Sequence, residues 1–390
     1  MIRTHLGRPI AMLVATLLCA TVSAQTPTEE AQKEAAGAAA LKPKDKLKLL
    51  GTDVPRGTTK RLSWTSGMAM EGFAAPAPVV VVNGSGPGPV LCLTAAVHGD
   101  ELNGIEVVRR VLKDVDVEEL NGAIIGVPIV NIQGFYRGTR YLPDRRDLNR
   151  SFPGNAKGSA ATRIAHAFFT DIVSHCSALI DLHTGSLDRT NLPQVRANLK
   201  LPQIARLTQA FGATVVLHSV GEKGSLRRAA TEAGIPAVTF EMGEPFRVQP
   251  EQVEHGAKAI ETLMYSLGMT HQRRYWGDPE PVYYASKWVR VDNGGILFSD
   301  VALGERVSKG ELLGIVTDPV TNQQYRIFAP ISGRVLGMAL NQVVLPGFAA
   351  YRIGTETSKS TAVTERTEDT NDDAPEDEDS NEDSAANSDG

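Results

Sequence analysis

The sequence is poor in cysteine, in aromatic residues and in net charge. Its 390 residues include three cysteines and 6% aromatic residues, and the formal net charge is −5. Three cysteines are too few for a disulfide framework, although Cys92 and Cys176 leave a single disulfide open. So weak a charge does not favour a nucleic-acid partner. The apolar run Ile10–Val22 is too short for a stable membrane-spanning helix.

The first residues have the composition of a targeting segment. Arg3 and Arg8 precede the apolar run, and Val22-Ser23-Ala24 forms a small-residue cleavage site. Residues 1–24 are therefore predicted to be a signal peptide. This implies an exported protein, periplasmic or secreted, with no stable membrane insertion.

The opposite end is strongly acidic. Positions 365–390 hold twelve acidic residues and one arginine, with no aromatic or large aliphatic residue to bury. We predict a disordered acidic tail over residues 356–390. Residues 25–60 begin with a stretch rich in Ala, Glu, Lys and Pro and are predicted to be a linker and N-terminal extension.

Between these ends, short β-branched runs alternate with helix-like stretches. Strands are predicted at Pro78–Val82, Val90–Val97, Ala123–Val130, Ala178–Leu182, Ala213–Leu217 and Ala237–Glu241, and helices at Asn103–Lys113, Ser159–Ser174, Leu201–Phe211 and Gln252–Leu267. This alternation predicts an α/β domain over residues 61–275, with a mixed, largely parallel sheet flanked by helices.

After about residue 275 the helical pattern stops. Short strands separated by glycines predict an all-β domain over residues 276–355. Its sequence, including GERVSKGELLGIV and IFAPISGRVLG, resembles the barrel-sandwich pattern of lipoyl and biotinyl carrier domains. Those domains present a modifiable lysine in a turn that here reads DPVTNQQYRI and contains no lysine, which argues against a carrier role.

Three residues form a candidate metal site. His98 and Glu101 lie three positions apart at a predicted strand-to-helix turn, so their side chains can point to the same side. His183 follows the predicted strand Ala178–Leu182, and ligands in open α/β sheets collect beyond the carboxyl ends of strands. Two histidines and a glutamate with an open fourth position are typical of catalytic zinc, although such a set accepts other divalent ions. Asp181 is a candidate to orient an imidazole.

Glu241 ends a third strand and is the predicted general base. A carboxylate at that sheet edge can take a proton from the attacking water and pass it to the leaving amine. Glu244 is the competing candidate, but it lies beyond the predicted strand end.

A polar loop separates the first two ligand segments. Arginine is suited to bidentate capture of a carboxylate, and a neighbouring asparagine can add a neutral hydrogen bond. Asn149 and Arg150 lie between apolar residues that would bury the turn, which favours a substrate-binding role for them. Arg145 and Arg146 instead fit a solvated basic loop.

Four motifs in order, VHGDELNG, DLNRSFPG, DLHTG and FEMGE, resemble the succinylglutamate desuccinylase/aspartoacylase family, which is related to the zinc carboxypeptidases. The resemblance covers roughly residues 75–350 and implies a C-terminal β domain that narrows the entrance to the active site. It implies one zinc ion per chain, bound by His98, Glu101 and His183, with Glu241 as the water-activating base.

The same resemblance implies roles for four further polar residues. Asn149 and Arg150 would bind a substrate carboxylate, and Arg140 would polarise the scissile carbonyl. Arg227 would hold another carboxylate, but the adjacent Arg228 leaves that assignment open between the two.

Together these observations predict a zinc-dependent hydrolase that cleaves the amide bond of an N-acyl amino acid. An exported metallocarboxypeptidase acting on peptides or cell-wall fragments would use the same residues and stays open. A non-catalytic metal- or ligand-binding module also stays open, although the motifs lack neither a ligand nor the base. The predicted partner is a small molecule or short peptide that bears a carboxylate, and the oligomeric state is not predicted.

Overall fold

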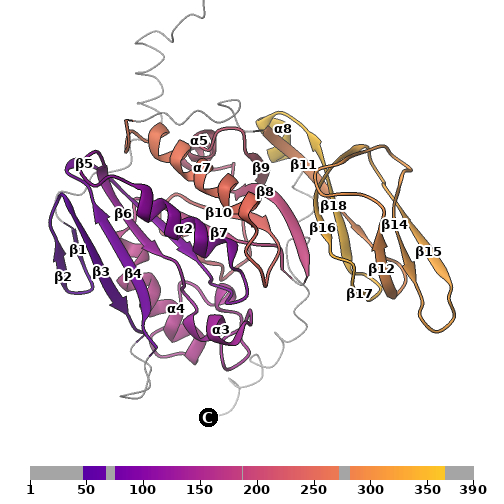
Figure 1. Ribbon diagram of the computed structural model, residues 1–390, viewed down its shortest axis with the longest axis horizontal. Helices are drawn as coiled ribbons and strands as arrows, with labels where there is room; N and C mark the ends of the chain where they lie inside the picture. Colours follow the sequence, from indigo (N-terminus) through magenta and orange to yellow (C-terminus); the bar gives the residue numbers. More distant parts are fainter. Residues whose placement is uncertain (1–46, 67–74, 187, 272–281, 365–390) are drawn as a thin grey trace, which may run out of the picture.

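The computed structural model describes residues 47–66, 75–186, 188–271 and 282–364 (Figure 1). The predicted signal peptide, most of the predicted linker and positions 365–390 of the predicted tail lie outside these ranges. Among the described residues, no helix is both long and apolar enough to cross a membrane.

A twelve-stranded mixed sheet runs through the molecule. In spatial order its strands are β13 (Arg306–Val307), β16 (Gly333–Ala339), β18 (Ala349–Glu356), β11 (Val282–Arg290), β9 (Val215–His218), β8 (Arg189–Ala197), β10 (Ala237–Gly243), β7 (Ala178–His183), β5 (Gly86–Ala95), β6 (Asn121–Val127), β4 (Ala77–Asn83) and β3 (Thr58–Trp64). Its centre, β10–β7–β5–β6, is parallel. The strands beyond β6 and most pairings of the C-terminal strands are antiparallel.

The central strands are buried on both faces because their sequences are apolar at consecutive positions. Along β5, Leu91 and Leu93 face one core cluster while Val90 and Cys92 face the other, as the alternation of a strand requires. The first cluster is covered by α2 (Asn103–Asp114), α5 (Pro202–Gln209) and α7 (Pro250–Ser266) (Figure 1). The second is covered by α4 (Ala160–Asp171) and α6 (Leu226–Glu232). The short helices α3 (Ile132–Arg137), η1 (Leu148–Arg150) and η2 (Val173–His175) lie in connections.

The C-terminal strands close part of the sheet into a ring. β8 pairs with β9, β9 with β11, β11 with β18 and β18 with β16, and β16 returns to β8. A second, four-stranded sheet is formed by β15 (Gln324–Phe328), β14 (Leu312–Thr317), β12 (Gly295–Ser299) and β17 (Val343–Val344). It shares a core cluster with β11, β16 and β18. Residues 282–356 are called the C-terminal β region below; Figure 1 shows it at one side of the α/β part.

Three predicted features need correction. The predicted linker includes β1 (Leu47–Leu49), β2 (Thr52–Val54) and the start of β3, because its apolar residues join the second core cluster. The predicted tail includes the end of β18 and helix α8 (Lys359–Thr364), whose Ala362 is buried. The sheet is mixed rather than largely parallel. Its centre and the pairings of β9 with β8 and β11 are parallel, whereas the outer strands pair antiparallel.

A disulfide joins Cys92 of β5 to Cys176, which lies just before β7. Both cysteines are buried, in agreement with the apolar runs around them. The bond links the strands that lead to His98 and His183.

Candidate metal and catalytic site

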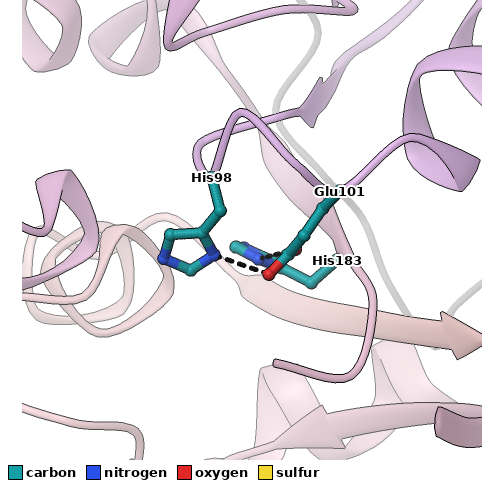
Figure 2. A group of neighbouring side chains, drawn as sticks. All are labelled: His98, Glu101 and His183. Carbon is teal, nitrogen blue, oxygen red and sulfur yellow. Dashed lines mark hydrogen bonds and ion pairs between the residues drawn. The ribbon is translucent and has the colours of Figure 1, made fainter. Parts of the chain in front are cut away.

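Two parallel strands bring the candidate metal ligands together. β5 leads into the turn with His98 and Glu101, and the neighbouring β7 ends at His183. Ala95 of β5 pairs with Leu182 of β7, so the two strands end at the same edge of the sheet. One ligand atom from each of the three side chains lies within 4.8 Å of the others (Figure 2).

The Glu101 carboxylate lies between the two imidazoles. Its Oε1 is 2.8 Å from His98 Nδ1, and its Oε2 is 2.9 Å from His183 Nδ1 (Figure 2). The backbone N–H of Thr184 also donates to Oε2, at 3.0 Å. Two imidazole nitrogens and a carboxylate gathered at one point are the donor set of catalytic zinc, so these residues fit a metal ion. The side chains lie together as the sequence indicates, and their role as ligands stays a prediction.

Each histidine has a second carboxylate at its other ring nitrogen. His183 Nε2 lies 2.8 Å from Asp181 Oδ2, and His98 Nε2 lies 3.1 Å from Asp147 Oδ1. Thr94 Oγ1 donates to Asp181 Oδ1 at 2.7 Å. A carboxylate at Nε2 holds the ring proton there, which leaves the Nδ1 lone pair for a cation.

Asp147 was missed by the sequence analysis, although it opens the DLNRSFPG motif. Its position two residues before Asn149, in a loop rich in arginine, was the feature that could have identified it. Asp147 accepts hydrogen bonds from the backbone N–H of Asn149 at 2.7 Å and from Arg140 Nη2 at 2.8 Å. One carboxylate thus connects His98 to the predicted substrate-binding loop.

Burial and ion pairing have opposite effects on the pKa values of the site. Burial by itself lowers the pKa of both histidines, but the surrounding carboxylates raise it overall, most strongly for His183 beside Asp181. Burial by itself raises the pKa of Glu101 and Asp147. His98 and His183 nevertheless hold the pKa of Glu101 well below its usual range, and His98 and Arg140 do the same for Asp147. The imidazoles and carboxylates of the site thus stabilise each other's charged forms.

The turn that carries His98 and Glu101 requires a glycine. A Cβ at Gly99 would lie 2.0 Å from the backbone carbonyl carbon of Gly134 in α3. No other residue fits this approach without separating the two segments. The contact with α3 therefore fixes the turn that holds His98 and Glu101. Helix α3 itself was not predicted from the sequence.

Glu241 lies one strand away from His183. The two residues pair in the parallel β10–β7 register, and both line the same cavity. Glu244 does not line that cavity and forms an ion pair with Arg247. The geometry therefore favours Glu241 over Glu244, and its role as the base stays a prediction.

Two residues of β8 hold the Glu241 carboxylate. Asn191 Nδ2 donates to Oε2 at 3.1 Å, and Arg196 Nη1 lies 3.4 Å from Oε1. Neither residue was identified from the sequence, because the polar segment RTNLPQVRA with its internal Pro193 does not have the composition of a central strand.

The predicted substrate-binding loop reaches the cavity. Arg140, Asn149 and Arg150 all line it. Arg140 donates to Asp147 through Nε at 3.2 Å, and its Nη1 lies 3.5 Å from Glu101 Oε1, so it stabilises the carboxylates of the site. The backbone N–H of Leu226, at the start of α6, donates to Asn149 Oδ1 at 2.8 Å. The contacts of these residues with a substrate stay predictions.

Arg227, rather than Arg228, belongs to the cavity. Its Nη1 donates to the backbone carbonyl of Ser219 at 2.7 Å and its Nε to Thr239 Oγ1 at 3.1 Å. Arg228 lies outside the cavity wall and pairs with Glu232 of the same helix at 2.8 Å. Position therefore favours Arg227 over Arg228, and its contact with a substrate carboxylate stays a prediction.

The candidate metal ligands, Glu241 with its two partners on β8, and the candidate substrate-binding residues line one cavity of about 470 Å³. Its wall from the α/β part is mostly polar, whereas the C-terminal β region adds Trp288, Arg290, Val343, Leu345, Pro346 and Phe348. Arg189 of β8 also lines it, with its guanidinium carbon 5.4 Å from the Trp288 ring centroid and 4.7 Å from that of Phe348. This cation–π contact ties β8 to the C-terminal β region at the cavity wall.

Solved structures with the same fold are known. A succinylglutamate desuccinylase/aspartoacylase from Rhodobacter sphaeroides superposes with a TM-score of 0.69 at 24% identity, covering 80% of this chain and 100% of that chain. The product-bound ectoine utilization protein EutE (DoeB) from Ruegeria pomeroyi gives a TM-score of 0.68 at 23% identity, covering 77% and 97%. These likenesses confirm a mixed α/β fold with a β-rich C-terminal region.

Sequence comparison finds a similar curated protein and a matching family model. The N-alpha-acetyl-L-2,4-diaminobutyric acid deacetylase of Halomonas elongata is 28% identical over 253 residues, which are 62% of this chain and 74% of that protein. The family model of the succinylglutamate desuccinylase/aspartoacylase catalytic domain matches residues 87–267, a range that holds all four motifs and every candidate site residue named from the sequence. Residues 87–267 are thus similar to the succinylglutamate desuccinylase/aspartoacylase catalytic domain.

Proposed function

We propose that this protein is a zinc-dependent hydrolase that cleaves the amide bond of an N-acyl amino acid. The observation that carries the proposal is the convergence of His98, Glu101 and His183 in one cavity with Glu241. The deacetylase from Halomonas elongata, which its name describes as acting on an N-acetylated amino acid, supports the substrate class. A relation to the zinc carboxypeptidases is part of the same proposal.

His98 and His183 would hold the ion through Nδ1, and Glu101 through its carboxylate. When bound, zinc supplies a Lewis acid that activates water and polarises a carbonyl. Another divalent ion is an alternative for the same ligand set. The carboxylates of Asp147 and Asp181 keep the imidazoles oriented toward the ion.

Glu241 would carry the protons of the reaction. It takes one from the attacking water and delivers it to the amide nitrogen as the carbon–nitrogen bond breaks, which yields a carboxylic acid and an amine. Its carboxylate is held by Asn191 and Arg196. Glu241 lines the cavity on the strand next to His183.

The arginine side chains would position the substrate. Asn149 and Arg150 bind the carboxylate of the amino acid, Arg227 binds a second anionic group, and Arg140 polarises the scissile carbonyl. Arg227 is buried and fixed by three hydrogen bonds, so it presents its charge at little cost in side-chain entropy.

A screen of the zinc-reconstituted protein against N-acyl amino acids and short peptides tests this function. We expect N-acyl amino acids to be hydrolysed, chelation to abolish the activity and zinc to restore it. Glu241→Gln should lower kcat by about 10²–10⁴-fold with bound zinc unchanged. Glu244→Gln, the matched control, should retain activity.

Two results contradict the proposal. Turnover of peptides alone would instead support an exported metallocarboxypeptidase. Zinc binding without turnover of either class would support a non-catalytic metal-binding module.

We also propose that the protein is exported. The signal-peptide composition of residues 1–24 supports this, and so does the Cys92–Cys176 disulfide, since disulfides persist in oxidising compartments. Cell fractionation and N-terminal sequencing of the mature protein test it, with cleavage expected after Ala24. Recovery of the uncleaved chain from the cytoplasm would contradict it.

A further inference from the structure

We propose that the C-terminal β region positions the general base, through contact of Gly337 with Asn191. The inference rests on the proposed role of Glu241. It makes Asn191 and Gly337 positioning residues, which act on the reaction only through the Glu241 carboxylate. Strand β16 is then part of the catalytic apparatus as well as part of the cavity's framework.

The first step is the contact of β8 with Glu241. β8 runs antiparallel to β10, with Gln194 opposite Glu241 and Arg196 opposite Thr239. In a regular ladder, position 192 would lie opposite Gly243, but Asn191 does, so β8 carries one extra residue there. Such a bulge reverses the side-chain alternation. Asn191 therefore points to the face of Glu241 and donates to Oε2 at 3.1 Å.

The second step is the contact of β16 with Asn191. Gly337 pairs with Asn191 in the antiparallel β16–β8 register. A Cβ at position 337 would lie 2.7 Å from Asn191 Oδ1, and the next nearest atom would be 3.6 Å away. Asn191 is only 4% exposed, so its amide has little space to move aside. Because glycine has no Cβ, Gly337 leaves the space that the side-chain amide of Asn191 occupies.

The third step is the effect on the base. Asn191 Nδ2 and Arg196 Nη1 contact different oxygens of Glu241, so together they define the plane of the carboxylate. A general base works only when its lone pair points at the proton it removes. A shift of the Asn191 amide would turn the carboxylate without removing any metal ligand or substrate-binding side chain.

The experiment is a double-mutant cycle on the full zinc-loaded protein, with Gly337→Ala, Asn191→Ala and the double variant. The substrate is the N-acyl amino acid turned over fastest by the wild type. Each single variant should lower kcat about 10- to 100-fold, with KM and bound zinc within about twofold of wild type. The double variant should be no slower than the slower single variant, because both changes act through one hydrogen bond.

Gly310→Ala is the matched control. It makes the same substitution in the C-terminal β region, at a φ of +85° with no atom within 4 Å of the added Cβ. It strains the backbone without contacting Asn191, so it should lower the urea midpoint and leave kcat unchanged. A similar loss of kcat in Gly310→Ala would overturn the inference, because general loosening of the region would then explain the effect.

Two further outcomes also overturn it. One is wild-type kcat in either single variant. The other is multiplication of the two losses in the double variant, since Gly337 would then act by another route. If Gly337→Ala does not fold, wild-type kcat in Asn191→Ala still overturns the inference. Full activity of Glu241→Gln, measured in parallel, would instead remove the proposed function itself.

Discussion

The two candidate histidine ligands share one arrangement: Nδ1 faces Glu101, and Nε2 faces an aspartate. The aspartates should therefore control metal affinity. Asp181→Asn should weaken zinc binding about 10- to 100-fold, because an amide holds the Nε2 proton of His183 less strongly than a carboxylate. Competition titration with a chelating dye measures this. Asp144→Asn changes an exposed aspartate three positions before Asp147 and should bind zinc like the wild type.

The raised histidine pKa values predict how stability changes with pH. In the metal-free protein, the folded state holds the protons of His98 and His183 more tightly than the unfolded state does. Their contribution to stability is therefore complete below about pH 6.5 and is lost as the pH rises through the folded pKa values.

A metal ion reverses this trend, because it binds only the neutral imidazoles. The difference in melting temperature between zinc-loaded and metal-free protein should therefore widen from pH 6 to pH 8. Thermal unfolding with and without zinc at each pH measures it. A difference that narrows with rising pH would mean that His98 and His183 do not bind the ion.

Individual site residues were predictable where a motif ended a strand. His98, Glu101, His183 and Glu241 all belong to such motifs, and the structure brings them to one cavity. Asn191 was not predictable, because its position depends on a bulge and on a glycine 146 residues further along the chain. Contacts of that kind leave no local signal in a single sequence.

At the scale of elements, the disulfide links β5 to the start of β7 across 84 residues of sequence. Cross-linking removes conformational entropy from the unfolded chain, and the loop here is long. The double variant Cys92→Ala/Cys176→Ala should therefore lose about 2–5 kcal/mol of unfolding free energy. Urea denaturation measures the loss.

Reduction supplies the control for this prediction. Dithiothreitol should lower the urea midpoint of the wild type and leave that of the double variant unchanged. Equal midpoints for the oxidised wild type and the double variant would mean that the bond contributes nothing to stability.

Most central strands could be predicted from the sequence, because a strand buried on both faces is a continuous run of apolar residues. Thus β5, β7 and β10 lie where Val90–Val97, Ala178–Leu182 and Ala237–Glu241 were predicted. β8 was missed because its burial comes from pairing with β10 and β16 rather than from its own composition. Helix α8 was missed because the acidic composition of the residues that follow it led to a prediction of disorder from residue 356 onward.

At the scale of the whole molecule, strand pairing joins the α/β part to the C-terminal β region. The pairings of β11 with β9 and of β16 with β8 join them, so we expect them to unfold together. Variants that keep only Trp64, on β3, or only Trp288, on β11, should give the same urea midpoint by fluorescence. A lower midpoint at Trp288 would show that the C-terminal β region unfolds independently.

The sequence predicted a change from alternating elements to strands near residue 275, which lies outside the described residues, and the elements described from β11 to β18 are strands. It did not predict that the later strands would complete the earlier sheet. Strand pairing between distant segments depends on edge hydrogen bonds, which composition does not reveal.

The closed ring of β8, β9, β11, β18 and β16 limits how such a protein can diversify. An exchange of the C-terminal β region by recombination would expose the edges of β8 and β9 and release Asn191 at the same time. New substrate preferences are therefore expected to arise by substitution in cavity-lining loops, such as the one with Leu345 and Pro346, while the two parts are inherited as one unit.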